Sequence, residues 1–350
     1  MTDTAVAHLA TLVADDLATY DDPAVQRAVL GLVEPFAIAR AFVDWVDQHL
    51  HEPAVAAWLW AVSVGCVAGL DLADGSKVVV KAYPTSRTDA ALRSMQAVQR
   101  AGRDGGVPLP EPCADPRPLG ASLATADLAL LDGRHPNLRR SPDRGAAARG
   151  FVDLLHRLRH VPADVAAARP PSERSVPTLY PAPHSPRFDF DATRRGAEWI
   201  DDLARDAKAR ISTLDVPPVL AHMDWRAENL RVSEDGGRVV GVYDCDAIRR
   251  EREAVAVGEV AAQHLVDWSD PAGPYFAPAP ECVAFAQTIE AERGAPFTTH
   301  EWSVIRASIV YAWCYTARCE HAAAARGDDK PQFQMRARLA EDGGALLRDH

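Results

Sequence analysis

The sequence predicts an α+β protein in which a small antiparallel sheet is followed by a larger helical part. Short apolar runs, broken by glycines and by the turn dipeptide Asp74-Gly75, indicate strands between residues 58 and 83. From about residue 140 onward, apolar residues recur instead at the three- and four-residue spacing of helices. A length of 350 residues, with 47% hydrophobic and 25% charged residues, suits a globular protein of two domains or lobes.

Residues 4–50 are expected to form helices, because their apolar residues also recur at helical spacing. We interpret residues 1–54 as a helical N-terminal extension that packs against the body of the protein. The apolar stripes consist of Val6, Leu9, Leu12 and Val13, of Val29, Leu30, Leu32 and Val33, and of Ile38, Phe42, Trp45 and Val46.

An antiparallel sheet is expected to begin at residue 58. Asp74-Gly75 lies between two apolar runs and predicts a hairpin with a type I′ turn, in which both central residues have positive φ. A helix is expected at 88–102, and residues 122–131 are expected to supply two further short strands. The first three expected strands are 58–64, 67–73 and 77–83.

The part of the chain after residue 140 is expected to be mostly helical. Ser-Pro and Asp at 141–143 are typical of a helix start, and an apolar stripe follows them. Residues 161–190 are rich in Pro, Ala, Arg and Ser and are expected to form an irregular surface loop. Later helices are expected at 192–212, 252–268, 279–293 and 300–325.

Bulk composition argues against several classes of protein. A net charge of −11 disfavours nucleic-acid binding, which needs a basic face. The six cysteines are scattered without a C-x-x-C pair, which favours free thiols in a reducing cytoplasm. The first residues lack a basic signal-peptide region, and no run reaches the ~18 apolar residues of a membrane span. We therefore expect a cytoplasmic protein that binds neither nucleic acid nor membrane.

The segment AHMDWRAENLRVSEDGGRVVGVYDCD, residues 221–246, carries the clearest chemical pattern. Asp224 precedes Asn229 by five residues, so a looped backbone can point both side chains to the same side. Asp244 ends an apolar run that a Gly-Gly turn joins to LRV. Phosphoryl transfer needs a carboxylate to accept a proton and oxygen ligands for Mg²⁺. The pattern therefore predicts Asp224 as the base and Asn229 with Asp244 as the metal site. Asp246 faces the same side if the strand continues.

HMDWRAENLRV and VYDCDA resemble the aminoglycoside phosphotransferase family, small-molecule kinases that are related in fold to protein kinases. The resemblance spans roughly residues 55–320. It implies a two-lobed protein-kinase-like fold, with a nucleotide-binding N-lobe at 55–133 and a helical catalytic and acceptor-binding C-lobe at 134–350. It also implies Mg²⁺-dependent transfer of the γ-phosphate of ATP or GTP to a hydroxyl of a small polar molecule, either an antibiotic of the aminoglycoside type or a metabolite.

The resemblance assigns roles residue by residue. It implies that Asp224 is the catalytic base, that Asn229 and Asp244 bind Mg²⁺, and that His222 supports the loop. It further implies that Lys81, on the third expected strand, pairs with nucleotide phosphates; the alternative is an edge-strand lysine in solvent.

Two more groups are candidates for phosphate binding. The loop that contains Ser63, Gly65 and Gly69 lies between the first two expected strands, where kinase-like folds cover the phosphates, although simple turn glycines remain the alternative. Arg226, two residues after the predicted base, could offset charge on the transferred group, or could instead pair with an acidic neighbour.

The sequence departs from the family pattern at the helix that follows the third strand. That helix usually supplies a glutamate that orients the lysine, but TDAALRSMQAVQRAG has no acidic residue after Asp89. Met95 or Gln96 occupies the expected position, and Gln96 could accept a hydrogen bond from Lys81. Otherwise another acid such as Glu259 serves, or nucleotide binding is weak, or the chain is a degenerate kinase.

The acceptor is not determined by the sequence, and neither are the preferred nucleotide and the oligomeric state. Aromatic and acidic residues of the last long helix line an acceptor pocket or form ordinary core. A metabolic kinase for a sugar, amino sugar or amino alcohol, and a nucleotide-binding module without catalysis, are the alternative functions. The residues of the helix are Trp302, Tyr311, Trp313, Tyr315 and Glu320.

Overall fold

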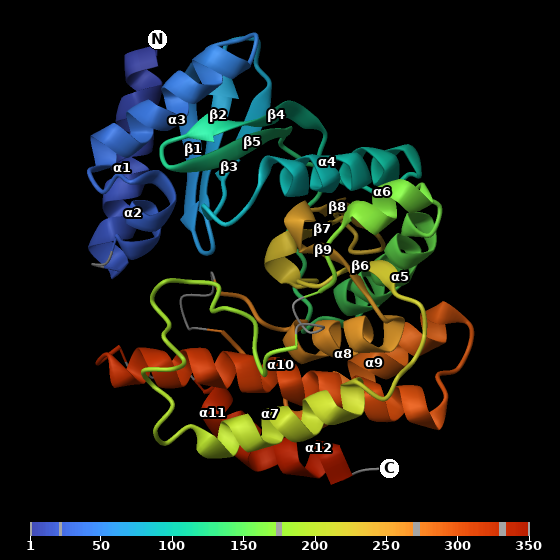
Figure 1. Cartoon of the computed structure of the whole chain (residues 1–350). Coiled ribbons are helices and arrows are strands. Elements are labelled where there is room, and N and C mark those ends of the chain that lie inside the picture. The colour runs from blue at the N-terminus through green and yellow to red at the C-terminus, as the bar shows by residue number, and fades with distance from the viewer. Residues whose placement is uncertain (1, 21–22, 173–176, 269–273, 329–333, 349–350) are drawn as a thin grey trace. The chain divides into compact units, whose positions relative to one another are not determined.

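The computed structural model describes residues 2–20, 23–172, 177–268, 274–328 and 334–348 (Figure 1). The chain forms two compact units. The first unit comprises residues 1–100, 110–130 and 184–187, and the second comprises residues 101–109, 131–183 and 188–350.

The first unit contains an antiparallel sheet of five strands with the spatial order β1-β2-β3-β5-β4. Its first three strands follow one another along the chain and pair in that order, which confirms the three strands expected between residues 58 and 83. The strands are β1 (Ala54–Val62), β2 (Cys66–Leu72), β3 (Lys77–Ala82), β4 (Pro112–Leu119) and β5 (Ser122–Leu128).

The last two strands differ from the prediction. Residues 122–131 supply one strand, β5, and its partner β4 lies earlier in the chain and contains Pro112, Pro116 and Pro118. Proline cannot donate a ladder hydrogen bond, but β4 is at the edge of the sheet and its register is irregular, so the missing donors are tolerated. The prolines concealed this strand from a reading of the sequence.

The hairpin between β2 and β3 is confirmed, but its turn is not of type I′. Gly75 has a φ of 87°, whereas among the non-glycine residues that the structure describes only Asp244 has a positive φ. Asp74 therefore lacks the left-handed conformation that type I′ requires. The turn is closed by the N–H of Leu72, which donates to the carbonyl of Ser76 at 2.8 Å, and by the Asp74 carboxylate, which accepts from Ser76 N–H at 2.8 Å.

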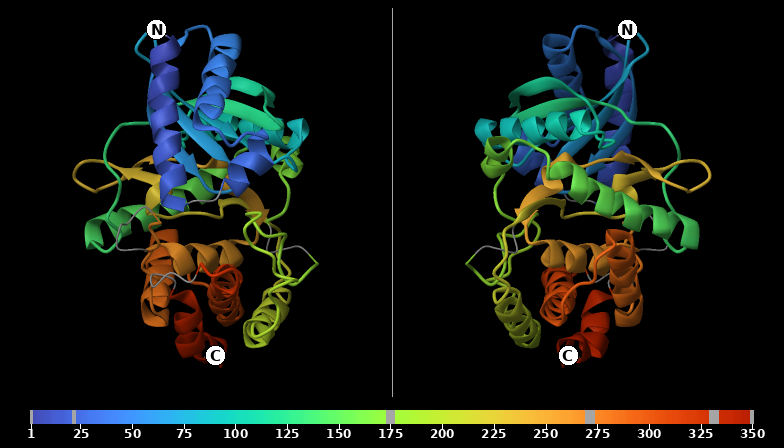
Figure 2. Two further views of the ribbon diagram at one scale, coloured as in Figure 1. Left: turned by 90° about the vertical axis from the view of Figure 1, so that its left-hand side faces the viewer. Right: turned by 90° about the vertical axis from the view of Figure 1, so that its right-hand side faces the viewer.

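Three helices pack on one face of this sheet (Figures 1 and 2). Their apolar residues, such as Leu9 and Phe42, share one hydrophobic core with Leu70, Val78 and Val80 of the sheet. The expected packing of the N-terminal helices against the body is therefore confirmed, and the helices complete the core of the first unit. They are α1 (Thr2–Tyr20), α2 (Ala24–Leu30) and α3 (Pro35–His49).

The second unit is mainly helical, as predicted. The N-cap Thr298 and Glu301 form a reciprocal capping box that fixes the start of the longest helix, α10. This helix packs against α7 and α8. The helices are α5 (Ser141–Leu158), α6 (Ala163–Ala168), α7 (Glu198–Ile211), α8 (Glu253–Gln263), α9 (Ala279–Arg293), α10 (Thr299–Ala325), α11 (Met335–Arg338) and α12 (Gly344–Arg348). Helix α4 (Asp89–Asp104) confirms the helix expected at 88–102, and its residues belong partly to the first unit and partly to the second.

Residues 161–190 are less irregular than expected. They begin with α6, and the side chains of Arg169 and Ser172 after it are 2% exposed. Residues 173–176 of this stretch lie outside the described residues. Part of this stretch is thus packed into the second unit rather than lying on its surface.

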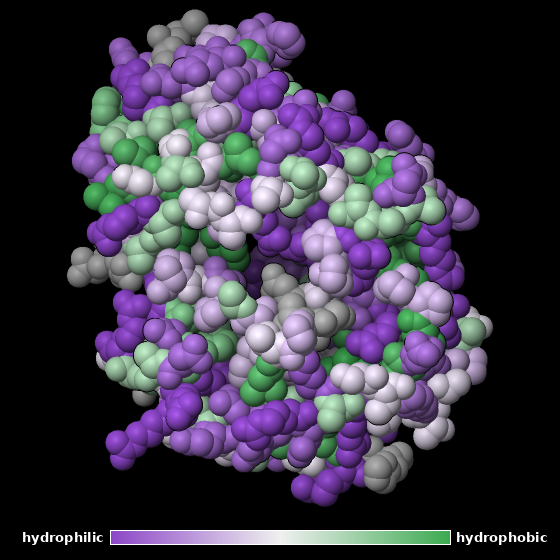
Figure 3. Space-filling model, in the orientation of Figure 1, coloured by the Kyte–Doolittle hydropathy of each residue, from purple (hydrophilic) through white to green (hydrophobic). Residues whose placement is uncertain are grey.

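Apolar side chains are mostly inside the two units. On the face shown in Figure 3, hydrophobic residues lie among hydrophilic ones. Across the described residues, none of the helices has both the length and the apolar content that a bilayer crossing needs. The exposed large apolar side chains of these residues are Val33, Phe36, Leu131, Trp199, Val216 and Trp268.

Candidate active site

The segment 221–246 folds into two short strand pairs of the second unit. Strand β6 (Val219–His222) pairs with β9 (Ile248–Glu251), so the chain that follows the segment returns to the start of the segment. Between them, β7 (Leu230–Val232) and β8 (Val239–Val242) form the predicted hairpin. The loop after β6 carries Asp224, and the turn after β8 carries Asp244.

His222 ties these two connections together. Its ring is fully buried; Nδ1 accepts from the N–H of Asp224 at 3.3 Å, and Nε2 lies 2.8 Å from the carbonyl oxygen of Tyr243. Accepting at Nδ1 and donating from Nε2 requires the neutral ring, and burial lowers the pKa of His222 in the same direction. His222 thus makes the contacts expected of a loop support.

Asp224 and Asn229 are in direct contact. The side-chain nitrogen Nδ2 of Asn229 donates to the carboxylate Oδ2 of Asp224 and to its backbone oxygen, both at 2.8 Å. Both of these hydrogen bonds use Nδ2, so Oδ1 is the atom of the Asn229 amide that could contact a cation. The five-residue spacing therefore does bring the two side chains together.

Asp244 has an uncommon backbone conformation. Its φ of 57° and ψ of 52° are left-handed, which Asp tolerates better than most residues but which still costs energy. The preceding residue, Tyr243, donates its N–H to the carbonyl of Asn229 at 2.8 Å. This backbone bond holds the connection to Asp244 beside Asn229.

Asp246 does not continue the strand. The strand β8 ends at Val242 and Cys245–Ala247 form a 3₁₀ turn, so the continuing strand on which the placement of Asp246 depended is not present. Its left-handed predecessor Asp244 turns the chain away from the hairpin.

Arg226 pairs with two carboxylates. Its Nε lies 3.1 Å from Asp224 Oδ1 and 3.1 Å from Glu228 Oε2. Burial disfavours the guanidinium charge, but Asp224 and Glu228 outweigh it and raise the pKa of Arg226. Of the two interpretations of Arg226, pairing with an acidic neighbour is observed in this structure.

Arg169 supports the turn after Asp244 and was missed in the sequence. Its guanidinium donates to the carbonyl of Ile248 at 2.9 and 2.7 Å and to that of Asp246 at 3.1 Å. In return, its own carbonyl accepts from Nε of Arg250 at 2.7 Å. Arg169 lies nearly 80 positions before its partners in a Pro- and Ala-rich stretch, and no local pattern distinguishes it.

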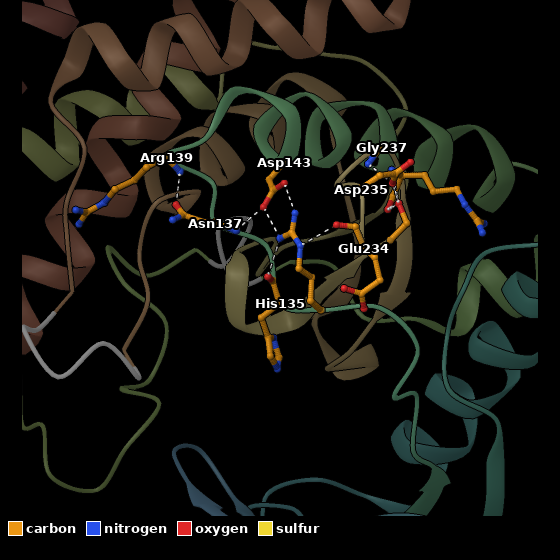
Figure 4. Close-up of polar contacts among 10 residues, drawn as sticks. His135, Asn137, Arg139, Asp143, Glu234, Asp235 and Gly237 are labelled. Atoms are coloured by element: carbon orange, nitrogen blue, oxygen red, sulfur yellow. Dashed lines mark hydrogen bonds and ion pairs between the residues drawn. The ribbon is translucent and has the colours of Figure 1, made fainter.

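A second arginine, Arg134, anchors the β7–β8 hairpin, and Figure 4 labels its partners Asp143 and Glu234. Arg134 binds both carboxylate oxygens of Asp143 at 2.7 and 2.8 Å and donates to the carbonyl of Glu234 at 3.3 Å. The guanidinium lowers the pKa of the buried Asp143. Gly236 is required here because a Cβ would lie 2.3 Å from Asp143 Oδ1. The expected helix start at Asp143 is therefore also an anchor for the hairpin.

The predicted phosphate-binding residues Lys81, Ser63 and Gly65 belong to the first unit. Lys81 is half-buried on β3, and its Nζ lies 5.3 Å from the centre of the Tyr83 ring. Ser63 and Gly65 form the short turn between β1 and β2, whereas Gly69 lies within β2 rather than in the loop. A Cβ on Gly65 would lie 2.2 Å from the Ala82 carbonyl oxygen, so close strand packing alone requires glycine there.

The position expected for the helix glutamate is occupied by residues with other partners. Gln96 donates Nε2 to the carbonyl of Ala114 at 2.7 Å, and its Oε1 has no hydrogen-bond partner among the described residues, so it does not accept from Lys81. Met95 contacts the hydroxyl of Tyr83 at 3.6 Å. Glu259, the suggested substitute, is buried in α8 of the second unit.

The long helix α10 contributes mostly core. Tyr311 and Trp313 are 1% exposed, and Tyr311 donates its hydroxyl to the carbonyl of Leu179. Glu320 accepts the N–H groups of Met335 and Arg336, both at 2.9 Å. These contacts are those of the ordinary-core alternative.

The side chains of Asn229 and Asp244 offer oxygen atoms, the kind of donor that Mg²⁺ prefers. Among the described residues, no group of three or more His, Cys, Asp or Glu side chains could hold a metal ion. Mg²⁺ typically keeps several waters and binds one or two carboxylates together with substrate phosphates. Asn229 Oδ1 and the Asp244 carboxylate match that smaller ligand set.

Solved structures with this fold are known. An amicoumacin kinase in complex with AMP-PNP and Ca²⁺ has a TM-score of 0.65 at 11% identity, over 87% of this chain and 92% of that one. The GDP and kanamycin complex of APH(2″)-IIia has a TM-score of 0.56 at 9% identity, over 87% and 98%. The ethanolamine kinase of Plasmodium vivax has a TM-score of 0.53 at 9% identity, over 97% and 92%.

These likenesses establish a protein-kinase-like fold. No curated protein sequence matches this chain. The sequence profile of the phosphotransferase enzyme family (APH) matches residues 70–251, more than half of the chain, including β3 and the whole segment 221–246. With the motifs, the fold and this match in agreement, the chain belongs to the phosphotransferase enzyme family, APH.

Proposed function

We propose that this small-molecule phosphotransferase moves the γ-phosphoryl group of ATP or GTP to a hydroxyl group of a small polar molecule in a Mg²⁺-dependent reaction. The hydroxyl oxygen attacks the γ-phosphorus, the bond from the γ-phosphorus to the β-phosphate oxygen breaks, and Asp224 receives the hydroxyl proton. Such a reaction depends mainly on positioning and on neutralised charge.

The contact between Asp224 and Asn229 is the observation that supports this proposal most. Each oxygen of the Asp224 carboxylate has one neighbour, Arg226 on Oδ1 and Asn229 on Oδ2. A carboxylate oxygen can accept more than one hydrogen bond, so a hydroxyl can still approach. The carboxylate is thereby oriented but not saturated, which is what a positioned base needs.

Asn229 and Asp244 would hold the metal. A bound Mg²⁺ would supply neutralisation of the negative charge of the phosphates. The bond from Tyr243 to Asn229 and the left-handed turn at Asp244 fix both ligands before any nucleotide arrives. The complexes of similar structures with AMP-PNP and Ca²⁺ and with GDP support the use of a nucleotide and a divalent cation.

Lys81, Ser63 and Gly65 would bind the phosphates of the nucleotide. Lys81 has the required charge, and the turn with Ser63 and Gly65 offers backbone N–H groups. Arg226 would place its guanidinium, whose Nε lies 3.1 Å from both Asp224 and Glu228, against the transferred phosphoryl group.

Two classes of acceptor are supported by particular similarities. The amicoumacin kinase and the kanamycin complex favour an antibiotic, and the ethanolamine kinase favours an amino alcohol. Acceptor loops vary on a shared catalytic frame, so the fold does not separate these. A panel of aminoglycosides, other hydroxylated antibiotics, sugars, amino sugars and amino alcohols would separate them by the nucleotide consumed with each.

The test of the proposed base is Asp224→Asn, which keeps the size of the side chain and removes its basicity. Turnover should fall by at least ~10²-fold, the contribution of a positioned base, while nucleotide binding changes little. Asp153→Asn, an exposed carboxylate on α5, is the matched control and should turn over normally. Near-normal turnover of Asp224→Asn would reject its role. Nucleotide binding by the wild-type protein, without consumption across the whole panel, would favour the non-catalytic module.

A further inference from the structure

Lys81 lies in a polar group that is assembled from one face of the sheet and from α4. Along β3, Val78, Val80 and Ala82 are buried in the core with α1–α3, so Lys81 belongs to the opposite face. There, the side-chain nitrogen Nε2 of Gln99 donates to the carbonyl of Pro110 at 2.9 Å and to Asp127 Oδ1 at 3.0 Å. The helix thus presents the Gln99 amide to this side of the sheet.

Asp127 is on the same sheet face as Lys81. In the pairing of β3 with β5, Lys81 is opposite Thr125 and Val79 is opposite Asp127. Side chains alternate along a strand, so Thr125 and Asp127 share their face with Lys81 and Val79. Lys81 and Asp127 are diagonal neighbours, and such pairs lie within reach of long side chains at about 7–8 Å between backbones.

Two other carboxylates of this sheet pair with other cations. Asp71 pairs with Lys77 near the other end of β3, and Asp115 pairs with Arg93 at 3.0 Å. The Gln99 side chain, itself fully buried, donates to Oδ1 of Asp127 and so fixes the orientation of this carboxylate.

We propose that Asp127 is the positioning residue for Lys81, in place of the helix glutamate that this chain lacks. The proposal rests on the proposed role of Lys81 in binding nucleotide phosphate. Because the carboxylate is on the neighbouring strand, the pair is set by the register of β3 and β5. Gln99 of α4 then orients the carboxylate through a hydrogen bond instead of supplying the charge.

The main test is Asp127→Asn, which can still accept the hydrogen bond from Gln99 but has no charge. We expect Mg·ATP and Mg·GTP to bind about tenfold more weakly, with the KM for the nucleotide rising by a similar factor and the thermal midpoint little changed. Asp71→Asn is the matched control, because it removes the acid of an Asp–Lys pair from the same sheet; its nucleotide binding should equal that of the wild type.

A rescue variant separates positioning from general stability. Met95→Glu returns an acid to the helix, and in the Asp127→Asn background it should restore most of the lost nucleotide affinity. Wild-type affinity in Asp127→Asn would overturn the proposal. So would an equal loss in Asp71→Asn, or a loss in Asp127→Asn that Met95→Glu leaves unchanged.

A double-mutant cycle tests the pair without nucleotide, so that its outcome does not depend on the proposed function. Asp127→Asn, Lys81→Met and the double variant are compared by urea unfolding. We expect the two effects on the unfolding equilibrium constant to deviate from additivity by at least about threefold. Additive effects would overturn the pairing, whereas coupling in a protein that consumes no nucleotide would leave the pairing intact and reject the proposed reaction.

Discussion

The segment 221–246 of the second unit and the β3–α4–β5 region of the first unit organise their polar groups in different ways. In the segment, Asp224, Asn229 and Tyr243 are joined directly by hydrogen bonds between near neighbours in the sequence. In the sheet region, Lys81, Gln99 and Asp127 come from three elements spread over almost fifty residues. The first arrangement is a local motif, and the second depends on strand register.

From this difference we expect changes in the two regions to have different consequences. Changing a residue within the segment breaks contacts that no other element can replace, because the short loop fixes every neighbour. The sheet region can replace a helix carboxylate by one from a strand, because several elements face the same space. The variants below test how strict the local arrangement is.

The largest effect is expected for Asp244→Asn. Asparagine also tolerates the left-handed conformation at this position, so the variant changes the charge of the proposed metal ligand more than the fold. Turnover should fall by about 10²–10³-fold, as for other losses of charge stabilisation, and more Mg²⁺ should be needed for half-maximal rate. Asp235→Asn, at the exposed tip of the same hairpin, is the control. An unchanged Mg²⁺ titration would contradict the assignment of Asp244.

The unfolding free energy should fall in acid because of His264, a buried residue of the second unit. Burial lowers the pKa of His264, which stacks on Phe285, from 6.5 to about 4. The unfolded chain takes up this proton near pH 6.5 but the folded chain only near pH 4, so the stabilisation is full above 6.5 and is lost as the pH falls toward 4. The loss should approach about 3 kcal/mol of unfolding free energy.

Urea unfolding at pH 7.5 and pH 4.5 would measure this difference. His264→Asn should make the unfolding free energy less dependent on pH, whereas His156→Asn, at an exposed position of α5, should not. Equal pH dependence in the wild type and His264→Asn would show that His264 is not the responsible group.

A smaller effect is expected for Arg169→Met. The change removes hydrogen bonds to the carbonyls of Asp246 and Ile248 and leaves those acceptors buried. We expect about a tenfold loss of turnover and a higher Mg²⁺ requirement, because the turn after Asp244 loses its support. Arg205→Met, at an exposed ion pair on α7, is the control, and Arg169→Lys should recover part of the loss. Normal Mg²⁺ dependence in Arg169→Met would limit Arg169 to a structural role.

The structure corrects the sequence-based expectations where a residue's neighbours are distant. The edge strand β4 was missed because its three prolines are acceptable only at an edge, which the sequence does not reveal. Asp246 was expected to face the same side only if the strand continued, but β8 ends at Val242 and the backbone at Asp244 is left-handed. Arg169 was missed because its carbonyl partners follow it by nearly eighty residues.

The sequence alone determined the α+β class, the long helices and the spacing of Asp224, Asn229 and Asp244, because periodicity and loop length act over a few residues. Only the tertiary structure decided that Asn229 presents its nitrogen to Asp224, that Arg226 bridges two carboxylates, and that Asp127 shares a sheet face with Lys81. Hydrogen-bond direction, ion pairing and strand register depend on which groups come into contact after folding. No local pattern in the sequence predicts those contacts.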